Sequence, residues 1–135
     1  MAWTEPKTNW TKDDFFNIED YRRITNNIMY LKDFLDSLFY GLSDMQLMSE
    51  KNISEPIYAR EINDIENNIE LLNIETYKLE IGETKEYFPN QRTMDFNELN
   101  RIEKTMFDIY TKMKKHKELL TRLSFRLGNQ KGLKV

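Results

Sequence analysis

The sequence has no cysteine and, among its 135 residues, only one histidine, four glycines and three prolines. The lack of cysteine excludes disulfide bonds and thiolate metal sites. The single histidine, His116, has no second histidine or cysteine with which to form a nucleophile–base pair or a zinc site. Because glycine and proline break helices, their scarcity predicts long helices. Long apolar runs and glycine-rich phosphate loops are also absent, so neither a membrane span nor a nucleotide site is expected.

Charged residues make up 32% of the chain and apolar residues 39%, which is typical of a soluble, charge-rich helical domain. A chain of this length forms one ordinary domain with a core. The net charge is only −3, but it is unevenly distributed. From Lys112 onward eight basic residues accompany one acid, Glu118, so residues 1–111 carry 12 basic and 22 acidic residues. This asymmetry marks the basic end as a feature that a function has to explain.

One short pattern occurs three times, each time where a helix is expected to begin. The copies lie at residues 17–28, 58–69 and 95–106. They share an acidic residue, an apolar residue next to it, an isoleucine three positions further and an apolar residue four beyond that. The isoleucine falls at positions 24, 65 and 102, with spacings of 41 and 37 residues. Such self-similarity predicts a structural unit repeated along the chain, although amphipathic helices can also share this spacing by chance.

The hydrophobic spacing predicts an all-α fold with three long helices, at about residues 17–42, 55–81 and 95–128. An extended arm at residues 1–16 precedes them, and a basic tail at residues 129–135 follows. Each helix carries a heptad stripe, defined as apolar residues at alternating steps of three and four, which favours packing against other helices. The stripes comprise Tyr21, Ile24, Ile28, Leu31, Leu35, Leu38, Leu42 and Met45; Ile62, Ile65, Ile69, Leu72, Thr76 and Leu79; and Leu99, Ile102, Met106, Ile109, Met113, His116, Leu120, Leu123 and Leu127.

The direction of the helices is predicted from the first connector. A first helix of ~26 residues would be about 39 Å long, and the 12 residues from 43 to 54 barely cover that distance when fully extended. We therefore expect up-down-up packing rather than three parallel helices.

Several apolar residues remain once the stripes are assigned, and these are candidates for contact with other subunits. The arm holds Trp3 and Trp10, which either fold back over the bundle as a lid or dock on a neighbouring subunit, where tryptophan is a favoured anchor. A second apolar face of the middle helix and two aromatic residues beside Pro89 complete the set, which comprises Leu71, Ile74, Tyr77, Ile81, Tyr87 and Phe88. A helix with two apolar faces is usually buried on both sides, so an oligomer is expected.

Catalysis is not expected from these residues. His116 lies on the stripe of the third helix, where a half-buried polar residue can set the helix register. The carboxylates of Asp13, Asp14, Glu19 and Asp20 lie where helix starts favour them, rather than as an acid–base pair. We therefore predict a protein with no catalytic residues, cofactor, metal or small-molecule substrate.

The basic end of the third helix supports an alternative function, a small regulator that binds nucleic acid or protein. Its helical part holds six cations that can neutralise phosphates: Lys112, Lys114, Lys115, Lys117, Arg122 and Arg126. The same cations complement the dipole at a helix C-terminus and suit an acidic protein surface equally well. Because Phe125 is the only aromatic residue near them, base stacking is poorly supported.

The first copy and the arm before it carry a resemblance to a known class of proteins. Residues 3–31 contain the pattern W-x-x-x-D-x-F-N-x-x-D-x-x-R-I-x-N-N-I, which resembles small tail-, baseplate- or fibre-associated structural proteins of phages and prophages of Gram-positive bacteria. The matching residues are Trp10, Asp14, Phe16, Asn17, Asp20, Arg23, Ile24, Asn27 and Ile28. Weaker echoes lie at residues 58–72 and 95–109, where Asn100-Arg101-Ile102-Glu103 fits the same core. The first copy departs from the usual wording, with Arg22 in place of asparagine and Thr25 in place of glutamate.

The resemblance implies a virion or tail-like particle component, assembled in the host cytoplasm, that acts as an oligomeric adaptor without turnover. Its partners would be other copies of itself and other tail or baseplate proteins, rather than nucleic acid or a membrane. It transfers no catalytic residue to this chain. Within the pattern, Arg23 and Asn27 lie beside the stripe, and we expect them to be exposed and to contact other subunits.

Overall fold

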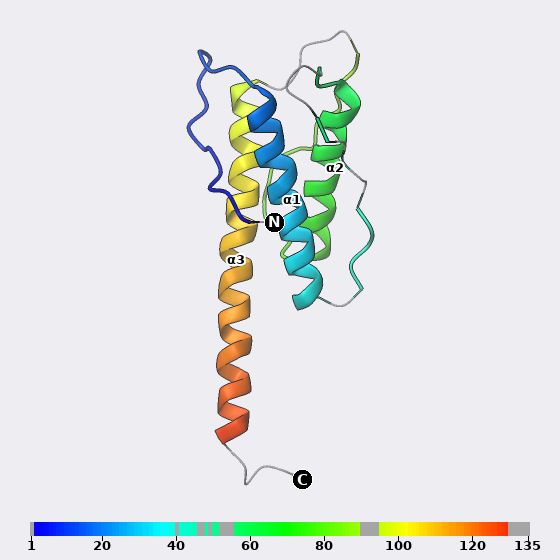
Figure 1. Ribbon diagram of the computed structural model, residues 1–135. Helices are drawn as coiled ribbons and strands as arrows, with labels where there is room; N and C mark the ends of the chain where they lie inside the picture. The colour runs from blue at the N-terminus through cyan, green and yellow to red at the C-terminus, as the bar shows by residue number, and fades with distance from the viewer. Residues whose placement is uncertain are drawn as a thin grey trace.

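The computed structural model of this protein describes residues 2–39, 41–45, 48, 50–51, 56–89 and 95–129. These residues form three helices and no strand. Helix α1 spans Ile18–Leu38, α2 spans Ala59–Glu75 and α3 spans Phe96–Asn129. Figure 1 shows the helices side by side, with the N-terminal arm along the upper half of α3 and the end of α3 projecting beyond α1 and α2.

All three helices run in the same direction, so the up-down-up prediction is wrong. Near the helix starts, Arg101 of α3 pairs with Glu66 of α2. At the other end, Tyr77, just after α2, contacts both Phe39, just after α1, and His116 in α3, with ring centroids 5.4 and 6.2 Å apart. Each helix begins at the top of Figure 1 and ends lower.

Parallel packing is possible because the first two helices are shorter, and the connectors longer, than predicted. Residues 39–58 separate α1 from α2, and residues 76–95 separate α2 from α3, which makes each connector 20 residues long. Such a segment can span about 66 Å when fully extended, whereas the 21 residues of α1 are only about 32 Å long. Each connector therefore has ample length to return to the start of the next helix.

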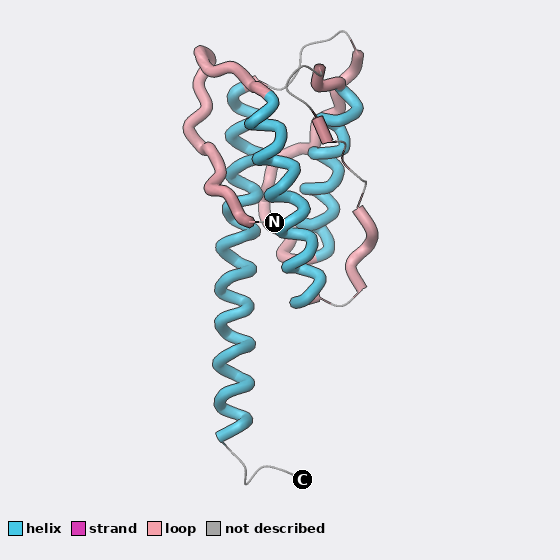
Figure 2. Tube along the Cα trace, in the orientation of Figure 1, coloured by secondary structure: helices cyan, strands magenta, loops and turns pink. Residues whose placement is uncertain are grey.

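The described residues of the first connector lie along the helices in this returning direction. Ser43 donates its backbone N–H to Glu75, at the end of α2, over 2.9 Å. Lys51 lies at the opposite end, where its carbonyl accepts hydrogen bonds of 3.0 and 2.6 Å from Arg22, near the start of α1. Figure 2 shows these loop segments, and those after α2, running beside the helices.

Helix α1 begins with a capping box, in which Asn17 and Asp20 each accept the other's backbone N–H at 3.1 Å. It ends at Leu38 rather than at residue 42, because Phe39 adopts extended backbone angles (φ −116°, ψ 132°). This turn out of the helix places the Phe39 ring edge-on against Tyr77.

Helix α2 ends at Glu75 rather than at residue 81, because Asn73 captures the chain that follows it. The Asn73 side chain accepts the backbone N–H of Leu79 and donates to its carbonyl, both at 2.8 Å. Between them Lys78 has a φ of 52°, in the left-handed region, which turns the chain back along the helix. The predicted start at residue 55 lies outside the described residues, and α2 begins at Ala59. Helix α3 differs from its predicted bounds by one residue at each end.

The core fills the space between the three helices. Its buried apolar side chains include Tyr21, Ile24, Ile28, Leu31 and Leu35 of α1; Ile62, Ile65, Ile69 and Leu72 of α2; and Ile102, Met106, Ile109 and Met113 of α3. Burial on α3 stops there, because Leu120 and Leu123, the next leucines of its predicted stripe, are 41% and 53% exposed. The bundle therefore leaves the end of α3 uncovered.

The parallel arrangement can be tested with spin labels, since the chain has no native cysteine. The pair Glu19→Cys/Arg60→Cys joins two exposed helix starts, and the pair Glu19→Cys/Ile74→Cys joins the start of α1 to the end of α2. Double electron–electron resonance should give the shorter mean distance for the first pair, by roughly 10–15 Å, because α2 rises 1.5 Å per residue. An up-down-up bundle would give the opposite order.

Candidate interaction site

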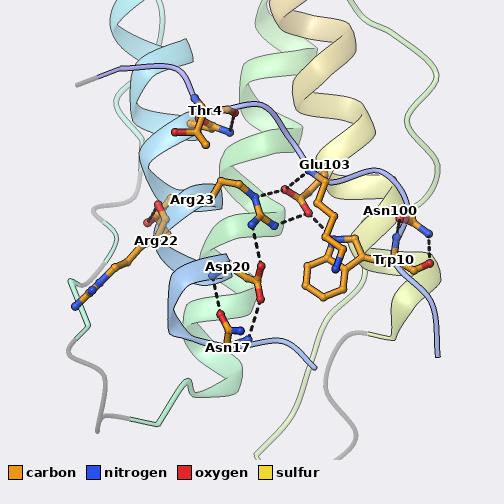
Figure 3. Close-up of polar contacts among 11 residues, drawn as sticks. Thr4, Trp10, Asn17, Asp20, Arg22, Arg23, Asn100 and Glu103 are labelled. Atoms are coloured by element: carbon orange, nitrogen blue, oxygen red, sulfur yellow. Dashed lines mark hydrogen bonds and ion pairs between the residues drawn. The ribbon is translucent and has the colours of Figure 1, made fainter. Parts of the chain in front are cut away.

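The N-terminal arm folds back on its own bundle, so Trp3 and Trp10 form a lid rather than a free anchor for another subunit. Trp10 is only 3% exposed, and its indole Nε1–H donates to Glu103. Asn100 holds the Trp10 backbone at both ends, accepting its N–H at 2.8 Å and donating to its carbonyl at 3.0 Å (Figure 3). Trp3 is half-buried and stacks on Tyr110, with ring centroids 4.1 Å apart.

The prediction that Arg23 and Asn27 are exposed is wrong. Asn27 is fully buried and holds the arm, because its side chain accepts the N–H of Thr4 at 3.0 Å and donates to the Thr4 carbonyl at 2.8 Å. The Arg23 guanidinium binds Glu103 through Nε and Nη2 and Asp20 through Nη1, each at 2.8 Å. Position relative to the heptad stripe could not reveal this burial, because the arm provides it.

Glu103 is the point where α1, α3 and the arm meet. Its side chain is 0% exposed. Besides the two bonds from Arg23, its carboxylate accepts the backbone N–H of Lys7 at 3.1 Å and the indole of Trp10. These four bonds use the capacity of the two oxygens. A bidentate arginine and further donors are what a buried carboxylate needs to offset its loss of hydration.

Arg101 makes the equivalent contact from α3 to α2. It donates through Nη2 to Glu66, whose side chain is 1% exposed, and through Nε to Glu98 at 2.9 Å. Burial raises the pKa of Glu66, and the hydrogen bond and charge of Arg101 only partly oppose that rise. Burial alone lowers the pKa of Arg101, but its bonds to Glu66 and Glu98 outweigh this effect, so the guanidinium stays charged.

These two contacts join equivalent positions of the repeated pattern. Arg23 is the seventh residue of the first copy and reaches Glu103, the ninth of the third copy. Arg101 is the seventh residue of the third copy and reaches Glu66, the ninth of the second. The helices therefore follow one another in the cyclic order α1, α3, α2, with α1 giving an arginine to α3 and α3 giving one to α2.

The junction that would complete the cycle, from α2 to α1, has lost this pair. The seventh residue of the second copy is Asp64, and the ninth of the first copy is Thr25. A different cation acts at this junction: Lys51, from the first connector, pairs with Glu61 at 2.6 Å, and both side chains are buried.

The sixth residue of each copy holds the backbone of an extended segment. The pairs are Asn100 with Trp10, Asn63 with Tyr87 and Arg22 with Lys51. Each segment residue precedes the next helix by eight or nine positions. The repeated unit is thus an extended segment followed by a helix. Each connector segment is held on the helix before it in the chain, and the arm is held on α3, which closes the ring of contacts.

Sequence reasoning missed most of this polar network. It did not single out Asn63, Asn100, Glu66 or Glu103 as functional residues. The signal was present in the alignment of the three copies, which places asparagine at the sixth position twice and glutamate at the ninth twice. Reading these polar positions as contacts between copies, rather than as features of separate helices, would have found them.

The apolar face predicted for the middle helix is divided by the early end of α2. Ile74 is 53% exposed and Phe88 51%, whereas Leu71, Tyr77, Ile81 and Tyr87 are half-buried. Tyr77 is drawn into the fold, where burial raises its pKa to about 12 and its hydroxyl lies 3.3 Å from Nδ1 of His116. Burial also raises the pKa of Tyr87, and the charge of Glu66 adds to that effect. Only Ile74 and Phe88 of this set remain well exposed.

An acidic groove of about 900 Å³ lies between α2 and residues 81–86. Its α2 wall is formed by Asn63, Asn67, Glu70, Asn73 and Ile74, and its other wall by Ile81, Gly82, Glu83, Thr84, Lys85 and Glu86. Lys85, the one cation in this lining, is paired with Glu98 at 2.9 Å. Glu70, Glu83 and Glu86 therefore set the charge of the groove.

The projecting end of α3 carries the predicted basic residues, all of which are exposed: Lys112, Lys114, Lys115, Lys117, Arg122 and Arg126. Apolar side chains are interspersed among them and are unusually exposed, with Leu119 at 57%, Leu120 at 41%, Leu123 at 53% and Phe125 at 71%. The end of α3 is therefore basic and apolar at once.

The described residues contain no cluster of three or more histidine or carboxylate side chains placed to hold a metal ion. In that same part of the chain, no helix combines the length and apolar character that a membrane crossing needs. No protein-family model, curated protein or solved structure matches this chain.

The role of Glu103 predicts a large loss of stability on its removal. Glu103→Ala leaves the half-buried Arg23 with Asp20 alone and the buried Trp10 indole without its acceptor, and we expect the free energy of unfolding to fall by about 3–5 kcal/mol. The matched control, Glu118→Ala, removes an exposed i,i+4 pair with Arg122 and should cost at most about 0.5 kcal/mol. Urea denaturation of both variants measures the difference. Equal effects would contradict the role assigned to Glu103.

Proposed function

We propose that this protein is a non-enzymatic structural component of a phage or phage-tail-like particle, an adaptor in the tail, baseplate or fibre-attachment region. The observation that carries the proposal is the end of α3, which leaves the bundle with Leu120 and Leu123 exposed among basic residues. A helical segment as short as this exposed end of α3 is only marginally stable in water without a partner. Such a surface suits a protein that functions by being covered in an assembly.

The part of the proposal that names a phage or phage-tail-like particle rests on the resemblance to phage structural proteins. Several residues that carry the resemblance have structural roles here: Asn17 and Asp20 cap α1, Trp10 and Asn27 hold the arm, and Arg23 joins α1 to α3. A shared sequence pattern that specifies how the arm and the helices of a bundle pack together suits a family of assembly proteins.

We further propose that the heptad stripe of α3 continues into a contact between chains. Leu120 and Leu123 follow the buried Met113 on the same face of the helix at heptad spacing. Covering them in an oligomer would remove this apolar surface from water.

The alternative, a nucleic-acid-binding regulator, is supported less well by the same helix. Its cations are interleaved with Leu119, Leu123 and Phe125, and a phosphate backbone offers nothing to cover those side chains. An acidic protein surface with apolar residues fits both properties.

Association with a particle is directly measurable. In a lysate from a host that carries the gene, the protein should band with density-purified particles, and a fused tag should be imaged at one end of the tail. Particles from an in-frame deletion of the gene serve as the control. Recovery of the protein only in the unassembled fraction would contradict the proposal.

A further inference from the structure

Among the described residues, the polar side chains from position 119 to 126 bond only within α3, whereas Lys117, just before them, lies over the Phe34 ring of α1 at 4.7 Å. The hydrogen bonds of residues 119–126 stay within the helix, from Thr121 to Lys117 and from Arg122 to Glu118. Figure 1 shows this segment pointing away from α1 and α2. Four of its basic residues, Lys112, Lys115, Arg122 and Arg126, form a basic stripe on one face of the helix, with Leu119 in the same row between Lys115 and Arg122.

The acidic groove has the opposite charge and matching apolar contacts. Glu83 and Glu86 are exposed on one wall, and Glu70 lies on the other. Ile74, which is 53% exposed, and Ile81 supply apolar surface in the same groove. The groove therefore offers acids and exposed isoleucine where the end of α3 offers cations, leucines and a phenylalanine.

The cyclic arrangement explains why this groove is open. On α3, the corresponding space beside the helix is filled by the arm, with Trp10 buried on Glu103 and Trp3 stacked on Tyr110. On α2, the segment that follows the same course lines the groove with residues 81–86. In the register set by the Asn100–Trp10 and Asn63–Tyr87 pairs, Tyr87 takes the place of Trp10, whereas Glu80 takes the place of Trp3. The groove therefore lacks the counterpart of the Trp3 ring that stacks on Tyr110.

We propose that the end of α3 of one copy docks in this groove of a second copy, with Leu123 and Phe125 against Ile74 and Ile81 and the basic stripe facing the groove acids. The contact deepens the proposed function by naming the surfaces through which copies meet, and it rests on that proposal for its place in a particle. Because the two surfaces differ, an assembly of any length keeps one free groove and one free helix end, so copies join head to tail.

The alternatives fit the surfaces less well. Pairing two α3 ends with each other would bring two basic stripes together, and from Lys112 onward Glu118 is the only acid to offset them. Nucleic acid would satisfy the cations but leave the 71% exposed Phe125 and its neighbouring leucines uncovered. A second copy covers both.

The head-to-tail arrangement is tested with two full-length variants that each block one surface. Glu83→Lys/Glu86→Lys reverses the charge of the groove, and Leu123→Ser/Phe125→Ser removes apolar contacts from the helix end. All four side chains are exposed, so the bundle should stay folded, which circular dichroism checks. Asp13→Lys/Asp33→Lys, at exposed acids outside the groove, matches the first charge change. Phe15→Ser, at an 87% exposed ring, controls for loss of an exposed aromatic side chain.

Sedimentation velocity over a range of concentrations gives the result. The unaltered protein and both controls should self-associate, while each blocked variant alone should associate at least about tenfold more weakly. Mixing the two blocked variants should restore a single one-to-one complex, because one contributes an intact groove and the other an intact helix end. That complementation is the expected signature of head-to-tail docking.

Other outcomes overturn the docking. A groove variant that self-associates as strongly as the unaltered protein would mean that the α3 ends pair with each other. Salt-dependent binding of a DNA duplex by a protein that stays monomeric would assign the basic stripe to nucleic acid. A strict monomer that still bands with particles would remove the docking and leave the proposed function standing. Head-to-tail association by a protein absent from particles would support the docking and remove the proposed function.

Discussion

The structure depends on one constraint, which is that a buried charged side chain needs a partner of opposite charge. Glu103 and Glu66 lie inside the bundle, and each is tolerated because an arginine from the neighbouring helix reaches it. These pairs form only if the helix starts lie at the same level, so they fix both the register and the parallel direction of the helices. An antiparallel neighbouring helix would leave the buried carboxylate without its arginine. A polar contact therefore sets the topology, while the isoleucines and leucines around it supply the burial.

Parallel packing imposes a second requirement, since the chain must return along the bundle before each helix. The sixth residue of each copy meets this requirement by holding the returning backbone, as Asn63 does at Tyr87. The same device, Asn100, holds the arm at Trp10. The arm thus performs for the first helix what the connectors perform for the others. One repeated unit explains the helix starts, the connectors and the arm together.

Features set by residues close together in the sequence were predicted, whereas features set by contacts between distant segments were missed. The start of α1 near residue 17 and the long α3 follow from short-range signals, and both are present. The end of α2 could not be read from periodicity, because Asn73 stops it through a bond to chain beyond the helix. The helix direction was inferred from a connector thought to be 12 residues long, whereas the true connectors are 20 residues long. Asn27 was placed on the surface because nothing local shows that the arm covers it. At the candidate site, the basic residues of α3 were identified, but the groove is formed by two segments that only the fold brings together.

The central claim is that the three copies are equivalent units joined in a cycle, with one arginine–glutamate junction lost between α2 and α1. The most direct test restores that junction with Asp64→Arg and Thr25→Glu, separately and together, and measures the unfolding free energies in urea as a double-mutant cycle. Equivalence predicts that each single change is destabilising and that the two together are coupled favourably by about 1 kcal/mol or more. Additive effects of the two changes would show that these positions do not face each other as their counterparts do, and would contradict the cyclic arrangement.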